Sequence, residues 1–122
     1  MLKLTLPLRL LLILWLSFSL LPAQAGGRYQ EAPANLNEII AAAKRGLEAI
    51  QKDNLEEALA AVSEARDLAK ASNKEKTTAP MQRASSRLRM AKGALRRGDT
   101  VKAGEILEKL IPYLEDVKRS YE

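Results

Sequence analysis

The feature that most constrains this chain is an internal repeat. The stretch AIQKDNLEEALAAV at 49–62 aligns in register with ALRRGDTVKAGEIL at 94–107. In each copy an alanine and a large aliphatic residue precede two polar residues, a short turn, and a second alanine with an aliphatic residue. Because only KDN at 52–54 or RGD at 97–99 separates the two runs, the chain must reverse sharply at both places. The repeat therefore predicts two similar helical hairpins.

Apolar residues on both sides of each turn recur at the three-and-four spacing that lines one face of a helix. Short turns within the hairpins and a longer link between them predict an all-α fold, an up-down-up-down four-helix bundle over 35–120 with hairpins at about 35–72 and 79–119. A tetratricopeptide-like solenoid is the competing packing, although such solenoids generally need three or more repeats. The residues predicted to face the core are Leu36, Ile39, Ile40, Ala43, Leu47, Ile50, Leu55, Ala58, Leu59, Val62, Ala65, Ala69, Ala84, Leu88, Ala91, Leu95, Val101, Leu107, Leu110, Leu114 and Val117.

Polar residues at the expected helix ends fit capping chemistry. Asn35 stands three residues before Glu38, which predicts a reciprocal capping box at the first helix. Asp53 or Asn54 is expected to cap the second helix.

The tripeptide Arg97-Gly98-Asp99 has the same structural interpretation. Arg97 ends one helix, Gly98 can take the left-handed conformation that follows a helix end, and Asp99 caps the next helix. An adhesion signal would require a mobile, projecting loop, so the sequence favours a turn between helices.

Three residues interrupt otherwise regular helices. Pro112 lacks a backbone donor and crowds the carbonyl four residues earlier, which predicts a kink or a break. Gly93 and Gly104 are isolated glycines inside predicted helices, and they are interpreted as points of close helix contact.

The first 25 residues have the form of a secretory signal peptide. Lys3 and Arg9 provide a basic start, LLLILWLSFSLL at 10–21 is an apolar run too short to span a membrane, and Ala23 and Ala25 match the cleavage positions. The sequence therefore predicts export to the periplasm or beyond, as a soluble mature chain that begins with a disordered segment at 26–34.

Composition limits the possible chemistry. The chain contains no Cys and no His, so disulfides and the usual ligands of zinc, copper and nickel are missing. We find no nucleophile–base set and no glycine-rich phosphate loop. The sequence predicts a non-enzymatic protein without a cofactor, a metal site or a catalytic residue.

Taken together, the export signal, the alanine-rich hairpins and the turns resemble the small periplasmic metal-binding protein family (SmbP-type). The resemblance is carried by EIIAAAKRGLEAIQKDNLEEALAAVSEARDLAKAS and KGALRRGDTVKAGEILEKL. It implies a periplasmic four-helix bundle that handles metal through repeated histidines. Since this chain has none, no metal-binding position of that family can be carried onto a residue here.

Charge is segregated along the sequence. Between Thr77 and Gly98 there is no acidic residue, and the six basic residues there are Arg83, Arg87, Arg89, Lys92, Arg96 and Arg97. The preceding helix is acidic, with Glu56, Glu57, Glu64 and Asp67. We expect part of the basic set to pair with that acidic helix and the rest to be exposed.

Arg89, Lys92 and Arg96 lie within about 60° on the helical wheel, and they are the predicted partner-binding edge. The function predicted on these grounds is an exported helical binding or interaction protein. Its partner is expected to be a protein, either an acidic one or a second copy of the chain, or else an anionic surface. Nucleic acid is not expected. The alternatives are a periplasmic metal-handling protein of the resembled family and a tetratricopeptide-like adaptor.

Overall fold

Four helices make up most of residues 31–122, the part of the chain that the computed structural model describes. They are α2 (Leu36–Gln51), α3 (Leu55–Glu75), α4 (Ala79–Arg96) and α5 (Thr100–Ser120). The predicted all-α fold is confirmed.

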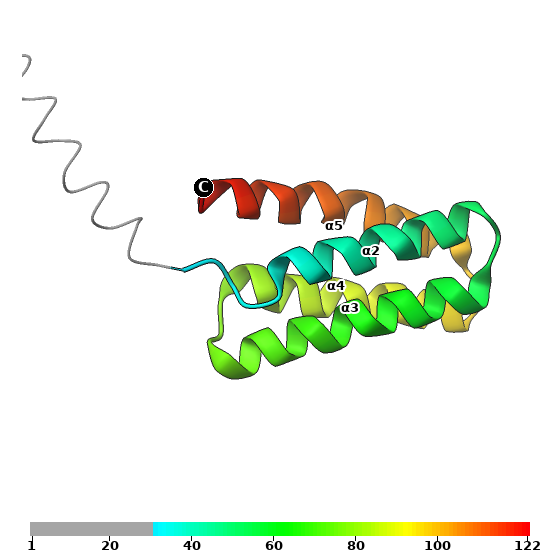
Figure 1. The fold of residues 1–122 in the computed structure, drawn as a ribbon. Helices are drawn as coiled ribbons and strands as arrows, with labels where there is room; N and C mark the ends of the chain where they lie inside the picture. The colour runs from blue at the N-terminus through cyan, green and yellow to red at the C-terminus, as the bar shows by residue number, and fades with distance from the viewer. Residues whose placement is uncertain (1–30) are drawn as a thin grey trace, which may run out of the picture. The chain divides into compact units, whose positions relative to one another are not determined.

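The helices close into a four-helix bundle. Helix α2 packs against both α3 and α5, and α4 packs against the same two helices (Figure 1). In a two-repeat solenoid the first and last helices would lie apart, whereas here α2 and α5 are neighbours. The predicted bundle is therefore the observed packing.

The predicted signal peptide at 1–25 and its cleavage residues Ala23 and Ala25 lie outside the described residues, as does 26–30 of the segment expected to be disordered. Within the rest of that segment, Pro33 is buried and its carbonyl accepts a hydrogen bond from the backbone N–H of Leu36 at 3.3 Å.

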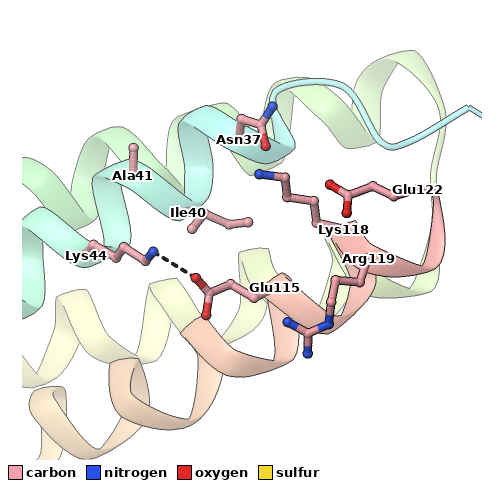
Figure 2. A pocket seen from close by; sticks show the side chains of 8 residues that line it. All are labelled: Asn37, Ile40, Ala41, Lys44, Glu115, Lys118, Arg119 and Glu122. Atoms are coloured by element: carbon pink, nitrogen blue, oxygen red, sulfur yellow. Dashed lines mark ion pairs between the residues drawn. The ribbon is translucent and has the colours of Figure 1, made fainter.

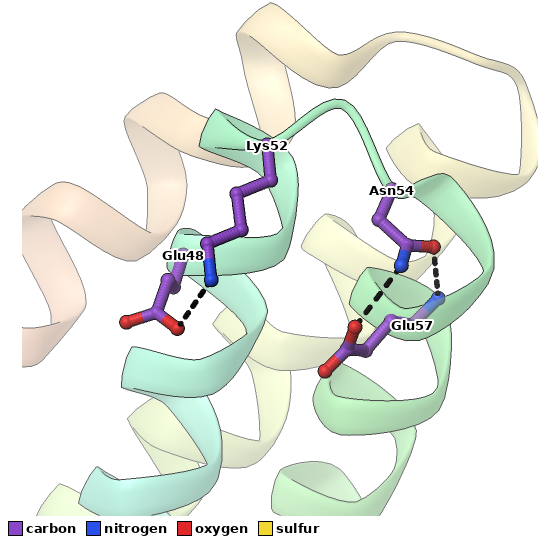
Figure 3. Close-up of polar contacts among 4 residues, drawn as sticks. All are labelled: Glu48, Lys52, Asn54 and Glu57. Carbon is purple, nitrogen blue, oxygen red and sulfur yellow. Dashed lines mark hydrogen bonds and ion pairs between the residues drawn. The ribbon is translucent and has the colours of Figure 1, made fainter.

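Both hairpin turns have the same hydrogen-bond pattern. In the first turn, the N–H of Asp53 donates to the carbonyl of Ile50 at 3.0 Å, and the N–H of Asn54 donates to that of Ala49 at 2.8 Å. Asp53 has a φ of 61°, the left-handed conformation that ends many helices. Figure 3 shows this turn, with the Lys52–Glu48 ion pair on its α2 side.

In the second turn, Gly98 donates to Leu95 at 3.0 Å, Asp99 donates to Ala94 at 2.8 Å, and Gly98 has a φ of 78°. Each of these residues matches its counterpart in the first turn at the spacing of the sequence repeat. The repeat in sequence is thus a repeat in backbone geometry, and the interpretation of Arg97-Gly98-Asp99 as a turn is confirmed.

Side-chain caps begin three of the helices. The Oδ1 of Asn54 accepts from the N–H of Glu57 at 3.2 Å at α3, and the Oδ1 of Asp99 accepts from that of Lys102 at 3.1 Å at α5. At α4 the hydroxyl of Thr78 accepts from the N–H of Met81 at 3.3 Å.

The predicted capping box at α2 is wrong. Asn35 has a φ of 67° and its side chain makes no cap hydrogen bond. Its Nδ2 instead donates to the carbonyl of Leu68 on α3 at 3.4 Å. The side chain therefore ties the start of α2 to a neighbouring helix rather than to its own first turn.

The core is built largely from alanine. Ala42, Ala43, Ala58, Ala65 and Ala69 are fully buried in α2 and α3, and alanines fill similar positions in α4 and α5. Small side chains allow close helix packing but bury little apolar area each. Larger fully buried side chains come from each helix and include Ile39, Val62, Met81, Leu88, Leu95, Leu107 and Leu114.

Most predicted core residues are buried, and two are exposed. Leu55 is 42% exposed and Val101 is 72% exposed. Each lies in the first turn of its helix, where neighbouring helices do not cover its side chain. Leu59 is only partly buried and packs on the margin of the core.

Helix α3 extends three residues past the predicted end at 72, because Ser72 is buried and the Nδ2 of Asn73 donates to the carbonyl of Met81 on α4 at 3.1 Å. Of the kink or break predicted at Pro112, the break is not found, because α5 continues through this residue. The ring of Pro112 is exposed, while Ile111 and Leu114 beside it are buried and hold α5 against the bundle.

Candidate functional site

Helix α4 carries five of the six basic residues singled out by the sequence, and the sixth, Arg97, is its C-cap. All six except the half-buried Lys92 are exposed. The expected pairing with the acidic helix is not found. Within residues 31–122, the four ion pairs are Lys44–Glu115, Arg45–Glu64, Lys52–Glu48 and Arg119–Asp116. None of them involves α4.

The direction of the acidic side chains on α3 explains this result. Glu64 pairs with Arg45 of α2 at 2.7 Å, and the carboxylate of Glu57 accepts from the Nδ2 of Asn54 at 3.0 Å. Glu57 and Glu64 are seven residues apart and share one edge of α3, the edge beside α2. The opposite edge of α3, beside α4, carries Arg66 and Lys70.

A groove of about 250 Å³ therefore runs between two basic helix edges. Arg66 and Lys70 on α3 face Arg89 on α4 across it, and no acidic residue lines it. Its other lining residues all bear polar hydrogen-bonding groups: Asn73, Gln82, Ser85 and Ser86.

Two atoms of this groove lack hydrogen-bond partners among residues 31–122. They are the Nε of Arg66 and the Oδ1 of Asn73, and both are buried. Buried polar atoms in folded proteins nearly always have a partner, which an ordered water can supply for these two. The exposed guanidinium of Arg89 has the geometry that binds carboxylate and phosphate oxygens in a bidentate manner.

The structure thus brings only part of the predicted site together. Arg89 lines the groove, whereas Lys92 and Arg96 do not, although they continue along the same edge of α4 toward the second turn. Arg66 and Lys70 were not assigned to the site from the sequence. Their four-residue spacing places both on the edge of α3 opposite Glu57 and Glu64, and this spacing was the signal that could have identified them. We call Arg66, Lys70, Arg89, Lys92 and Arg96 the basic surface.

A second groove, of about 460 Å³ between α2 and α5, has a different electrostatic character (Figure 2). The Nζ of Lys44 lies 2.8 Å from the carboxylate of Glu115 across it. The hydrogen bond from Lys44, and then its charge, hold the pKa of Glu115 below its ordinary value, with smaller contributions from Arg119 and Lys118. Acidic and basic side chains neutralise each other here, unlike at the basic surface.

Two other kinds of feature are not found among residues 31–122. No group of three or more Asp and Glu side chains is placed to hold a metal ion in the part of the chain that the structure describes. None of the four helices is long and apolar enough to cross a membrane.

Comparison with protein-family models, with curated proteins and with solved structures finds no match for this chain.

Proposed function

We propose that this protein is an exported, non-enzymatic binding protein that recognises an acidic segment of a protein partner through the basic surface of α3 and α4. The observation that carries the proposal is the groove between these helices, where Arg66, Lys70 and Arg89 meet without a lining acidic residue. Like charges gathered in this way repel one another, and an anion placed among them relieves that repulsion.

The amides and hydroxyls of the groove supply further hydrogen-bond donors for a carboxylate. Lys92 and Arg96 extend the positive potential along α4 beyond the groove, which favours an extended acidic segment over a single small anion. Binding of this kind is steered by long-range attraction and weakens as salt rises, because the Debye length is about 8 Å at physiological ionic strength.

The test is a salt series with a labelled oligoglutamate peptide, followed by fluorescence anisotropy. Arg89→Glu with Arg96→Glu should lower the affinity at low salt by about tenfold or more. The matched control is Lys74→Glu with Lys76→Glu, which changes the net charge equally at exposed positions outside the groove. The control variant should lose much less affinity for the peptide.

Each double variant should lose only a small and similar amount of stability. None of the four residues forms an ion pair within residues 31–122, and each pair contains one basic residue from the last turn of a helix, Lys74 or Arg96, that favours the helix dipole. If wild type and Arg89→Glu/Arg96→Glu bind alike at every salt concentration, the proposal is wrong. Binding to vesicles of anionic phospholipid without binding to oligoglutamate would replace the acidic protein segment with a membrane surface.

Export rests on the sequence pattern at 1–25 alone. Expression in a bacterial host should yield a mature chain that begins at Gly26, because Ala23 and Ala25 suit the signal peptidase. Intact-mass measurement of the periplasmic fraction checks this, and a retained Met1 with partition into membranes would contradict it.

A further inference from the structure

A groove of about 380 Å³ lies on the other side of α4, between α4 and α5. It combines an apolar floor with a basic rim, and Glu105 is the one acidic residue among those that line it. The floor consists of Met90, Ile106, Leu110 and Tyr113, and the rim consists of Arg83, Arg87, Lys102 and Lys109.

Contacts within the groove hold parts of it in place. The guanidinium carbon of Arg83 lies 5.0 Å from the centre of the Tyr113 ring, within the range of a cation–π interaction. Ile106 and Tyr113 pack on the core from one side and face the groove from the other. Met90 is 41% exposed, and its flexible side chain can adapt to an apolar ligand.

The floor of the groove follows two turns of α5. Ile106, Leu110 and Tyr113 stand at i, i+4 and i+7 along α5, so they form a stripe about 10 Å long at 1.5 Å per residue. Lys102 and Lys109 stand seven residues apart and border the same two turns. Leu110 is only 3% exposed, so Ile106 and Tyr113 supply most of the apolar surface that α5 offers to the groove. An apolar groove that follows two turns of a helix can accept the apolar face of an amphipathic helix.

We propose that this groove docks an acidic amphipathic helix of a protein partner. Apolar side chains of that helix, spaced by three and four residues, lie on the floor. Its carboxylates lie against the rim, where Arg83, Arg87, Lys102 and Lys109 outnumber the single acid Glu105. This charge complementarity, together with the elongated apolar stripe, selects such a helix over a compact ligand, which would cover only part of the stripe.

This site is distinct from the basic surface. The groove beside α3 is lined by amides, hydroxyls and cations, whereas the groove beside α5 offers apolar surface as well. An oligoglutamate peptide should therefore bind here weakly, because it has nothing to place on the floor.

The probe is a synthetic peptide of about 15 residues, with Leu at helical three-and-four spacing and Glu at most other positions. A scrambled peptide of the same composition keeps the charge and removes the apolar face. Wild type should bind the first peptide at least about tenfold more tightly than the scrambled one, as measured by calorimetry.

Arg87→Glu with Lys109→Glu should weaken binding by about tenfold relative to the control Lys74→Glu with Lys76→Glu. Met90→Ser removes a partly exposed apolar side chain that lies outside the buried core, and it should weaken binding severalfold without altering the fold. If the double reversal does not fold, Met90→Ser decides the matter. Arg89→Glu with Arg96→Glu should behave as the control does, so failure at one groove is distinguishable from failure at the other.

Four outcomes would overturn the proposal. They are equal binding of the two peptides, no binding of the amphipathic peptide, unchanged binding by Met90→Ser, and binding to anionic vesicles alone. Sedimentation that shows a dimer of wild type, abolished by Met90→Ser, would assign the groove to a second copy of the chain instead.

Discussion

Substituting Gly46 by alanine tests the closeness of the helices directly. A Cβ at this position in α2 would lie 2.9 Å from Cγ2 of Val62 on α3 and 3.6 Å from Cδ1 of Leu107 on α5. Carbon atoms in good contact are about 3.5–4.0 Å apart, so the first distance requires a shift. Val62 is fully buried and β-branched, and its side chain cannot rotate away freely.

Two opposing effects set the magnitude. Alanine is favoured over glycine in a helix interior by about 1 kcal/mol. Overpacking of a well-packed core costs about 1–3 kcal/mol. Gly46→Ala should therefore lower the free energy of unfolding by about 0–2 kcal/mol, and each kcal/mol should lower the melting temperature by about 4–8 °C for a domain of this size.

Two other helical glycines serve as matched controls. A Cβ on Gly93 would meet only Nη1 of Arg97 at 3.4 Å, the mobile end of a side chain, and one on Gly104 would meet Cγ2 of Ile50 at 3.9 Å, an ordinary contact. Gly93→Ala and Gly104→Ala should each gain up to about 1 kcal/mol. The expected close contact at Gly93 is therefore not found.

The assay is urea unfolding followed by far-ultraviolet circular dichroism. The double variant Gly46→Ala/Val62→Ala should lose less stability than the two single variants together, because the smaller side chain on α3 makes room for the new methyl group. If Gly46→Ala stabilises the protein as much as Gly93→Ala does, α2 and α3 do not approach each other closely at Gly46 and the reasoning is refuted.

Four further predictions concern stability and ionisation. Leu107→Asp should abolish cooperative thermal unfolding, because it places an unpaired charge at a fully buried position. Ser72→Ala should raise the free energy of unfolding by about 1 kcal/mol, since the buried hydroxyl has no partner among residues 31–122. Asp99→Ala should cost about 1 kcal/mol through loss of the α5 cap, and both of these changes are measured by urea unfolding. The Glu115 carboxyl should titrate below its ordinary pKa of 4.5 by NMR, and Lys44→Ala should move it back toward 4.5. The Glu115–Lys44 pair thus adds stability above the ordinary pKa, and that stability is lost as the pH falls through the lowered one.

The hairpins could be predicted because their signals are local. A turn of three residues leaves the chain few ways to reverse, and the left-handed positions Asp53 and Gly98 and the caps Asn54 and Asp99 act within a few residues. Bundle closure followed from the apolar stripes. The four predicted positions of α4 are all buried, because that helix has little other apolar surface to bury.

The errors come from interactions between helices. Asn35 looked like a local cap, but its side chain donates to α3 instead. Gly46 showed no signal of its own in the sequence, because a close approach depends on which side chains face it from two other helices. Leu55 was assigned to the core by periodicity, although its turn lies at the end of the bundle.

The candidate site was half predicted for a related reason. Counting charges per helix made α3 acidic and α4 basic, which predicted attraction between them. The position of each charge around the helix decides the outcome instead: Glu64 faces α2, while Arg66 and Lys70 face α4.

The position of α4 explains why one helix borders two grooves of different chemistry. Its core contacts are mostly alanine and leucine along one stripe, so both edges of the helix remain available for polar side chains. On the α3 side, Ser85 and Ser86 give a hydrophilic groove in which charge alone can select a ligand. On the α5 side, Met90 and the stripe that begins at Ile106 add apolar area, so a ligand there must match shape as well as charge. Because both edges are basic, the two proposals together predict that an acidic partner is attracted to either one. They further predict that the apolar content of the ligand decides which groove it occupies.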